Sequence, residues 1–133
     1  MKYEAWVKII PTLSKLWLNH RSGSEEARRE YELKVKEMEL KKQEMELEKG
    51  QLELKLERIR FEREKWEAKE EKSSDPETKR EAQEKAEKYR SKESVKEQEL
   101  QEIAGLLEAA DEFNDAVRLG DEEKVEELMY MMM

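Results

Sequence analysis

The sequence predicts an all-α protein built around one long, coiled-coil-like helix, with short flanking helices and a C-terminal helical hairpin. Three observations predict this fold. Charged residues make up 47% of the 133 residues and hydrophobic residues only 36%, which leaves little apolar material for a globular core. Four glycines and two prolines are too few to separate many short strands. Apolar residues also recur every seven positions through the middle of the chain, as in helices that pack against helices.

Residues 1–21 predict an amphipathic N-terminal helix. Its apolar residues recur near helical spacing: Tyr3, Trp6, Val7, Ile10, Leu13, Leu16, Trp17 and Leu18. Pro11 lacks a backbone donor and clashes with the preceding turn, so we expect a kink or a break near Ile10. Tryptophans among lysines also suit a membrane interface, although docking on protein is the favoured interpretation for this segment.

Residues 24–72 predict one long helix. A linker at residues 20–24 precedes it, and Ser22 and Glu25 have the spacing of a capping box. The helical pattern then continues to Lys72. At about 1.5 Å per residue such a helix is about 70 Å long, which exceeds what a globular domain requires. Its length therefore predicts an element of an assembly.

Residues 75–91 predict a polar spacer helix. The run Ser73-Ser74-Asp75-Pro76-Glu77 places a capping side chain directly before a proline, which is typical of a first helical turn. The segment then offers only a thin apolar stripe, formed by Ala82, Ala86 and Tyr89. We therefore expect little burial there.

Residues 94–133 predict an acidic helical hairpin. The apolar face of its first arm carries Leu100, Ile103, Leu106, Leu107, Ala110, Phe113 and Val117. Gly120 should end this arm, and Asp121 should cap a second arm. The apolar residues of that second arm are Val125, Leu128, Met129 and Met132. From Glu99 onward eleven acidic residues stand against two basic ones, so the net charge of −8 belongs to this region.

Two apolar seams repeat together along the long helix, each with a period of seven residues. The first, which we call the methionine seam, comprises Tyr31, Met38, Met45, Leu52, Ile59 and Trp66. The second, which we call the leucine seam, comprises Leu33, Leu40, Leu47, Leu54, Phe61 and Ala68. An ordinary coiled coil spaces its two apolar positions three and four apart, whereas these seams are two and five apart. A step of two residues is about 200° of rotation, so the seams lie on nearly opposite faces.

A helix with two opposed apolar faces is expected to have neighbours on both sides. The alternation around Tyr31, Leu33 and Val35 also permits a strand, but the seven-residue register and the abundance of Glu, Lys, Met and Leu favour a helix. Two interpretations of the seams remain open. They are either an ordinary core shared with the rest of the chain or surfaces for self-assembly.

The sequence predicts no catalytic residue, no metal site and no cofactor. His20 is the only histidine, there is no cysteine, and we expect His20 to be solvated in the linker. Asp111, Glu112 and Asp115 lack the ligand spacing of a calcium loop. The most basic run comprises Arg58, Arg60, Arg63 and Lys65. Glutamates interleave with this run, which argues against direct binding of nucleic acid.

These observations favour a non-catalytic structural or scaffolding protein that assembles through helix–helix packing. Its partners are expected to be protein helices, either in a homo-oligomer or in a subunit of a virion or other large assembly. The predicted protein interface comprises Tyr31, Leu33, Met38, Leu40, Met45, Leu47, Leu52, Leu54, Ile59, Phe61, Trp66, Trp6, Trp17, Ile103, Leu107 and Phe113.

Two alternatives remain beside the scaffold hypothesis. The acidic C-terminal region suits an adaptor or inhibitor that occupies a groove on a partner protein. The capped, cysteine-free helices are also typical of a designed helical protein. The lack of cysteine and of any spanning or secretory segment predicts a location in the cytoplasm, or in a particle assembled there, and not secretion.

Overall fold

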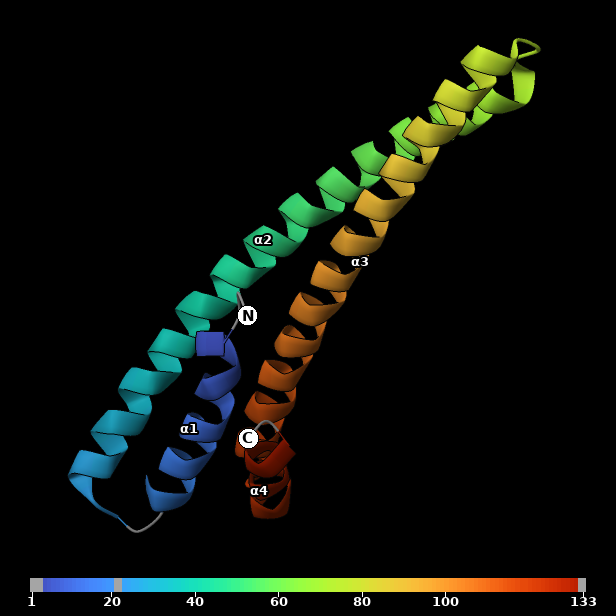
Figure 1. The fold of residues 1–133 in the computed structure, drawn as a ribbon. Coiled ribbons are helices and arrows are strands. Elements are labelled where there is room, and N and C mark those ends of the chain that lie inside the picture. Colours follow the sequence, from blue (N-terminus) through green and yellow to red (C-terminus); the bar gives the residue numbers. More distant parts are fainter. Residues whose placement is uncertain (1–3, 21–22, 132–133) are drawn as a thin grey trace. The chain divides into compact units, whose positions relative to one another are not determined.

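The protein is all-α, as the sequence predicts. The computed structural model describes residues 4–20 and 23–131, with the side chains of residues 4–6 outside the described part. Within these residues the helices are α1 (Glu4–His20), α2 (Glu25–Lys72), α3 (Pro76–Leu119) and α4 (Glu122–Met131) (Figure 1). No helix in this part of the chain is both long and apolar enough to cross a membrane.

The chain forms two compact units, and each long helix contributes to both. The first unit comprises Met1–Glu46 and Ala104–Met133, and the second comprises Leu47–Ile103. The first unit therefore contains α1, the start of α2, the end of α3 and α4. The second unit is an antiparallel pair formed by the end of α2 and the start of α3 (Figure 1).

Helix α1 continues through Pro11, so the expected break near Ile10 does not occur. Ile10 and Leu13, on either side of the proline, are fully buried in the first unit. Their burial offsets the lost backbone hydrogen bond, because each large apolar side chain removed from water contributes about 1.5–3 kcal/mol. Two hydroxyl groups near the proline donate to carbonyls of the same helix, Thr12 to Lys8 O at 2.9 Å and Ser14 to Ile10 O at 2.8 Å.

Helix α2 begins and ends where the sequence predicts. The backbone N–H of Ala27 points to the hydroxyl of Ser24 at 3.5 Å, which is the arrangement of an N-cap. Ser22, the residue expected to form a capping box with Glu25, lies outside the described residues. Gly23 precedes the cap with a φ of 88°, a left-handed conformation that glycine adopts without strain.

Helix α3 is a single helix, whereas the sequence suggested a spacer at 75–91 and a separate helix from residue 94. It is continuous through this junction because no glycine or proline interrupts the chain between Pro76 and Gly105. Its start follows the prediction. The carboxylate of Asp75 accepts hydrogen bonds from the Thr78 hydroxyl at 2.7 Å and the Thr78 backbone N–H at 3.4 Å.

The predicted turn between the last two helices is present. Gly120 has a φ of 68°, and its N–H donates to Val117 O at 3.1 Å while the N–H of Asp121 donates to Ala116 O at 2.8 Å. These two bonds form a Schellman motif, which ends α3. Asp121 then caps α4 by accepting the Lys124 N–H at 3.1 Å. Helix α4 packs against α1, and Met132 lies outside the described residues.

The two units have different cores. The first unit buries large side chains from all of its helices: Ile10, Leu13, Trp17, Met38, Met45, Phe113, Val125 and Leu128. The second unit buries a narrower row, formed by Leu52, Leu56, Ala82, Ala86 and Ile103. The two alanines are fully buried, so the thin stripe expected on the spacer segment does contact a neighbouring helix. Small side chains there let α2 and α3 pack closely within this unit.

Candidate protein interaction surface

The leucine seam is exposed along its whole length. The exposed fractions are 68% for Leu33, 63% for Leu40, 70% for Leu47, 60% for Leu54 and 66% for Phe61, and Ala68 is exposed as well. Leu33 and Leu40 belong to the first unit and the other members to the second, so both units leave this face of α2 uncovered. Single exposed leucines are ordinary, but a regular row of large apolar side chains is typical of an interaction surface.

The methionine seam faces the chain's own core. In the first unit Met38 is fully buried and Met45 is 6% exposed, and in the second unit Leu52 is 4% exposed. Ile59 and Trp66 are half-buried, as is Tyr31 at the other end of the seam. Burial raises the pKa of the Tyr31 phenol. These residues therefore stabilise the units themselves.

Four further residues of the predicted interface are also internal. Trp17, Leu107 and Phe113 are buried in the first unit, and Ile103 is buried in the second. The side chain of Trp6 lies outside the described part of the chain. Of the predicted interface, the members of the leucine seam are thus the described residues that remain open to a partner.

His20 is half-buried, so the expectation that it is solvated is wrong. Its ring stacks on Tyr31, with centroids 5.2 Å apart and planes inclined by 29°. This contact joins the end of α1 to the start of α2 in the first unit. Sequence spacing did not indicate it, because the linker reverses the chain between the two rings.

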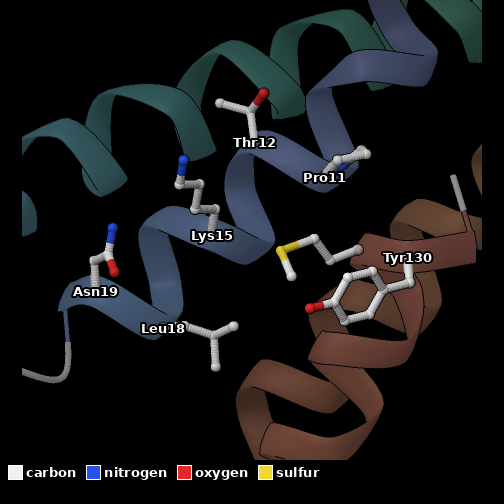
Figure 2. A pocket seen from close by; sticks show the side chains of 7 residues that line it. Pro11, Thr12, Lys15, Leu18, Asn19 and Tyr130 are labelled. Carbon is white, nitrogen blue, oxygen red and sulfur yellow. The ribbon is translucent and has the colours of Figure 1, made fainter. Parts of the chain in front are cut away.

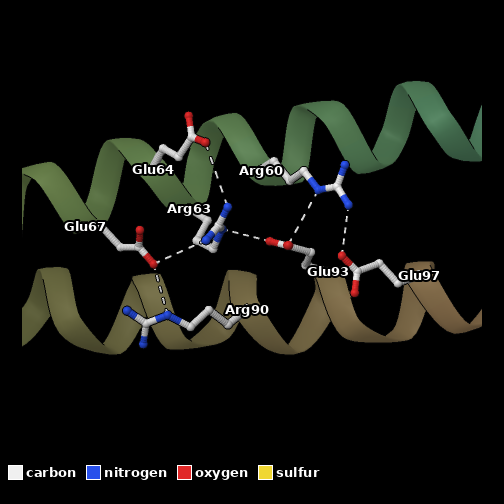
Figure 3. Close-up of polar contacts among 7 residues, drawn as sticks. All are labelled: Arg60, Arg63, Glu64, Glu67, Arg90, Glu93 and Glu97. Atoms are coloured by element: carbon white, nitrogen blue, oxygen red, sulfur yellow. Dashed lines mark hydrogen bonds and ion pairs between the residues drawn. The ribbon is translucent and has the colours of Figure 1, made fainter.

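The basic run on α2 is divided between two faces of the helix. Arg60 and Arg63 form ion pairs with α3 in the second unit (Figure 3). Arg58 and Lys65 are exposed beside the leucine seam. Arg60 lies 2.9 Å from Glu97, and Arg63 Nε lies 2.8 Å from Glu93 Oε2. This division separates the two cations that pair with α3 from the two that are exposed.

Arg63 and Glu93 are the most buried members of this network. Their side chains are 25% and 16% exposed, and Arg63 also lies 3.7 Å from Glu67, which in turn accepts from Arg90 at 3.1 Å (Figure 3). The close pair lacks the alignment of a hydrogen bond, so its attraction is mainly electrostatic. No pattern in the sequence indicates this pair, since the two residues are 30 positions apart and carry no local motif.

Trp66 lies near the turn between α2 and α3, where it is surrounded by lysines. Lys69 Nζ lies 4.8 Å from the ring centroid, and Lys85 Nζ from α3 lies 4.3 Å from it. Both distances suit a cation–π interaction. Trp66 therefore helps to join the two helices of the second unit and is only partly available to a partner.

A shallow groove lies between α1 and α4 in the first unit. Leu18 of α1 and Tyr130 of α4 border it, together with Pro11 and Lys15 (Figure 2). Tyr130 and Met131 are 68% and 69% exposed, and neither belongs to the predicted apolar face of the last helix.

The described residues include no group of three or more histidine, cysteine or carboxylate side chains placed to hold a metal ion. Comparison with known proteins gives no match: no family model fits the chain, and neither a curated protein nor a solved structure is significantly similar to it.

Proposed function

We propose that this chain is a non-catalytic structural or scaffolding protein that assembles through helix–helix packing on the leucine seam. One observation carries the proposal. On a single helix, two apolar seams repeat with the same period, and the chain covers only one of them. Covering the leucine seam would contribute a large free energy of association, because burying apolar surface contributes about 25 cal/mol per Å². A protein helix is the natural occupant of such a row.

The role suits a subunit of a large assembly, of which a virion is one example. The cysteine-free composition is compatible with a reducing compartment, so the cytoplasm, or a particle assembled there, is the proposed setting. The adaptor hypothesis receives less support. Leu119, Tyr130 and Met131 of the acidic C-terminal region are exposed. Its residues Phe113, Val125 and Leu128 are buried in the first unit, and Trp17 is buried there too. These side chains are occupied and do not offer an anchor for a partner groove.

Sedimentation velocity over a range of concentrations tests the proposal. The wild-type chain should associate, whereas the double variant Leu47→Glu with Leu54→Glu should sediment as a monomer. Both leucines are exposed in the second unit, so the helical circular dichroism of the variant should remain close to that of the wild type.

The matched control is Val95→Glu, which introduces the same charge at another exposed apolar residue of the second unit. Val95 lies on α3, outside the seam, and its variant should associate as the wild type does. A wild-type chain that stays monomeric at every concentration would contradict the proposal, as would equal effects of the seam and control variants.

A further inference from the structure

The leucine seam is bordered by two rows of mainly polar residues, and each row reverses its charge along α2. One row follows the seam by three residues and comprises Lys36, Gln43, Gly50, Glu57 and Glu64. The other follows it by four residues and comprises Glu37, Glu44, Gln51, Arg58 and Lys65. These offsets place the rows about 60° and 40° from the seam, on its two sides. The first row changes from basic to acidic and the second from acidic to basic, with Gly50 and Gln51 at the crossover.

This pattern is self-complementary in an antiparallel pair. If two α2 helices pair antiparallel about a twofold axis near Gly50 and Gln51, each row meets the same row of the other copy in reverse order. Glu44 then lies opposite Arg58 of the second copy, and Glu37 lies opposite Lys65. In the other row, Lys36 lies opposite Glu64.

The same twofold axis also pairs the apolar residues of the leucine seam. Leu47 then faces Leu54 of the second copy, and Leu40 faces Phe61. In a parallel pair, each seam residue would face its own copy, but each flanking row would meet the other row, so Lys36 would lie near Glu37 of the second copy and Glu57 near Arg58. Opposite charges therefore meet in both orientations, but only the antiparallel pair places Gly50 opposite Gly50 of the second copy, whereas a parallel pair places it near Gln51. We infer that the leucine seam binds a second copy of this chain in antiparallel orientation, with the twofold axis near Gly50 and Gln51, an inference that rests on the proposed function.

Two of the flanking charges are available for such pairs. Glu44 and Arg58 are exposed, and neither makes an ion pair in the part of the chain that the structure describes. This separates Arg58 from Arg60 and Arg63, which are held by α3. Glu37 is already paired with Lys34 at 3.0 Å and Lys41 at 3.6 Å, and these contacts lower the pKa of its carboxyl group. The Glu44–Arg58 pair is therefore the sharpest test of the register.

Gly50 provides an independent observation at the crossover. It lies inside α2, where glycine weakens a helix relative to alanine. A Cβ built there meets no atom within 4 Å, so packing inside the chain does not require a glycine. At a twofold axis Gly50 would lie close to Gly50 of the second copy. The missing side chain would then let the two backbones approach.

Cysteine crosslinking tests the orientation, and the chain has no cysteine of its own. A disulfide needs Cα atoms within about 4.4–6.8 Å, so it reports direct opposition. Gln51→Cys should crosslink to itself in the antiparallel pair, where it faces its own copy across the twofold axis. A mixture of Leu40→Cys and Phe61→Cys proteins should give the mixed dimer, whereas Leu40→Cys alone should give little product. Efficient self-crosslinking of Leu40→Cys would show a parallel pair and overturn the inference.

Charge reversal tests the register in sedimentation equilibrium. Glu44→Arg places two arginines opposite each other at two symmetric sites, so the dissociation constant should rise by about tenfold or more. The double variant Glu44→Arg with Arg58→Glu restores opposite charges and should restore the dimer. The matched control is Glu53→Arg, at an exposed residue about 100° round the helix from Leu54, which should leave the dissociation constant unchanged. Equal weakening by Glu44→Arg and Glu53→Arg, or no rescue by the double variant, would overturn the inference.

These outcomes distinguish failure of the inference from failure of the proposed function. Loss of association on charging Leu47 and Leu54, together with self-crosslinking of Leu40→Cys, would keep seam-driven assembly and remove the antiparallel arrangement. A monomeric wild type would remove both.

Discussion

The two seams of α2 have the same period and opposite environments. Met38 and Leu40 are two residues apart on one helix, yet Met38 is fully buried and Leu40 is 63% exposed. The same contrast recurs in the second unit between Leu52 and Leu54, which are 4% and 60% exposed. A heptad repeat therefore identifies the faces of a helix that suit packing, but tertiary contacts decide which face the chain itself occupies.

The largest expected effect comes from truncating the two seams in turn. Met38→Ala should lower the free energy of unfolding by about 2–5 kcal/mol, because it leaves a cavity in the core of the first unit. Leu40→Ala should change it by less than about 0.5 kcal/mol, since the side chain is exposed in the monomer. Urea unfolding measures both values, at a protein concentration low enough that association does not contribute.

In sedimentation experiments the larger effect on association should come from Leu40→Ala, not from Met38→Ala. Leu40→Ala should weaken association, whereas Met38→Ala should leave it unchanged as long as α2 remains folded. Similar losses of stability for both variants would show that the leucine seam is covered within the chain, and would remove the contrast between the seams.

Much of this architecture could be predicted from local chemistry. Ser24 and Asp75 cap helices, and Gly120 ends one, because these positions depend on backbone donors, acceptors and a left-handed φ within a few residues. The period of seven identified both seams in the same way. What these features share is that their causes lie within about one or two helical turns.

Other features depended on contacts between distant residues and were missed. The continuity of α1 through Pro11 depends on burial against the rest of the first unit. The ion pair of Arg63 and Glu93 depends on how α2 and α3 pair. Periodicity also could not show which seam the chain would cover, because both seams are apolar, have the same period and lie on opposite faces of α2. The structure buries the methionine seam and leaves the leucine seam exposed.

Removing ion pairs of the second unit should change the free energy of unfolding less than truncating Met38 does. Glu93→Gln removes the partner of a largely buried Arg63 and should cost about 1–2 kcal/mol of unfolding free energy, less than for a fully buried pair because both groups keep some exposure. The matched control Glu84→Gln breaks the exposed pair with Arg80 on α3, where the Glu84 side chain is 69% exposed. That change should cost less than about 0.5 kcal/mol. Equal costs in urea unfolding would show that Glu93 gains nothing from its position between the helices.

The smallest expected effect is at the turn that joins the helices of the second unit. Hydrogen bonds from Thr78 lower the pKa of the Asp75 carboxyl below its ordinary value of 3.8. A depressed pKa means that the ionised form stabilises the folded state, so its contribution is fully present above about pH 4 and is lost as the pH falls through the folded-state value. Asp75→Asn keeps a capping oxygen but cannot titrate, so its thermal midpoint should lie below the wild type by roughly a few degrees at pH 7. That difference should vanish in strong acid, where the wild-type carboxyl is protonated. Circular dichroism during heating measures the two thermal midpoints. A difference that stays constant from pH 7 to strong acid would show that the effect of Asp75 comes from its shape and not from its charge.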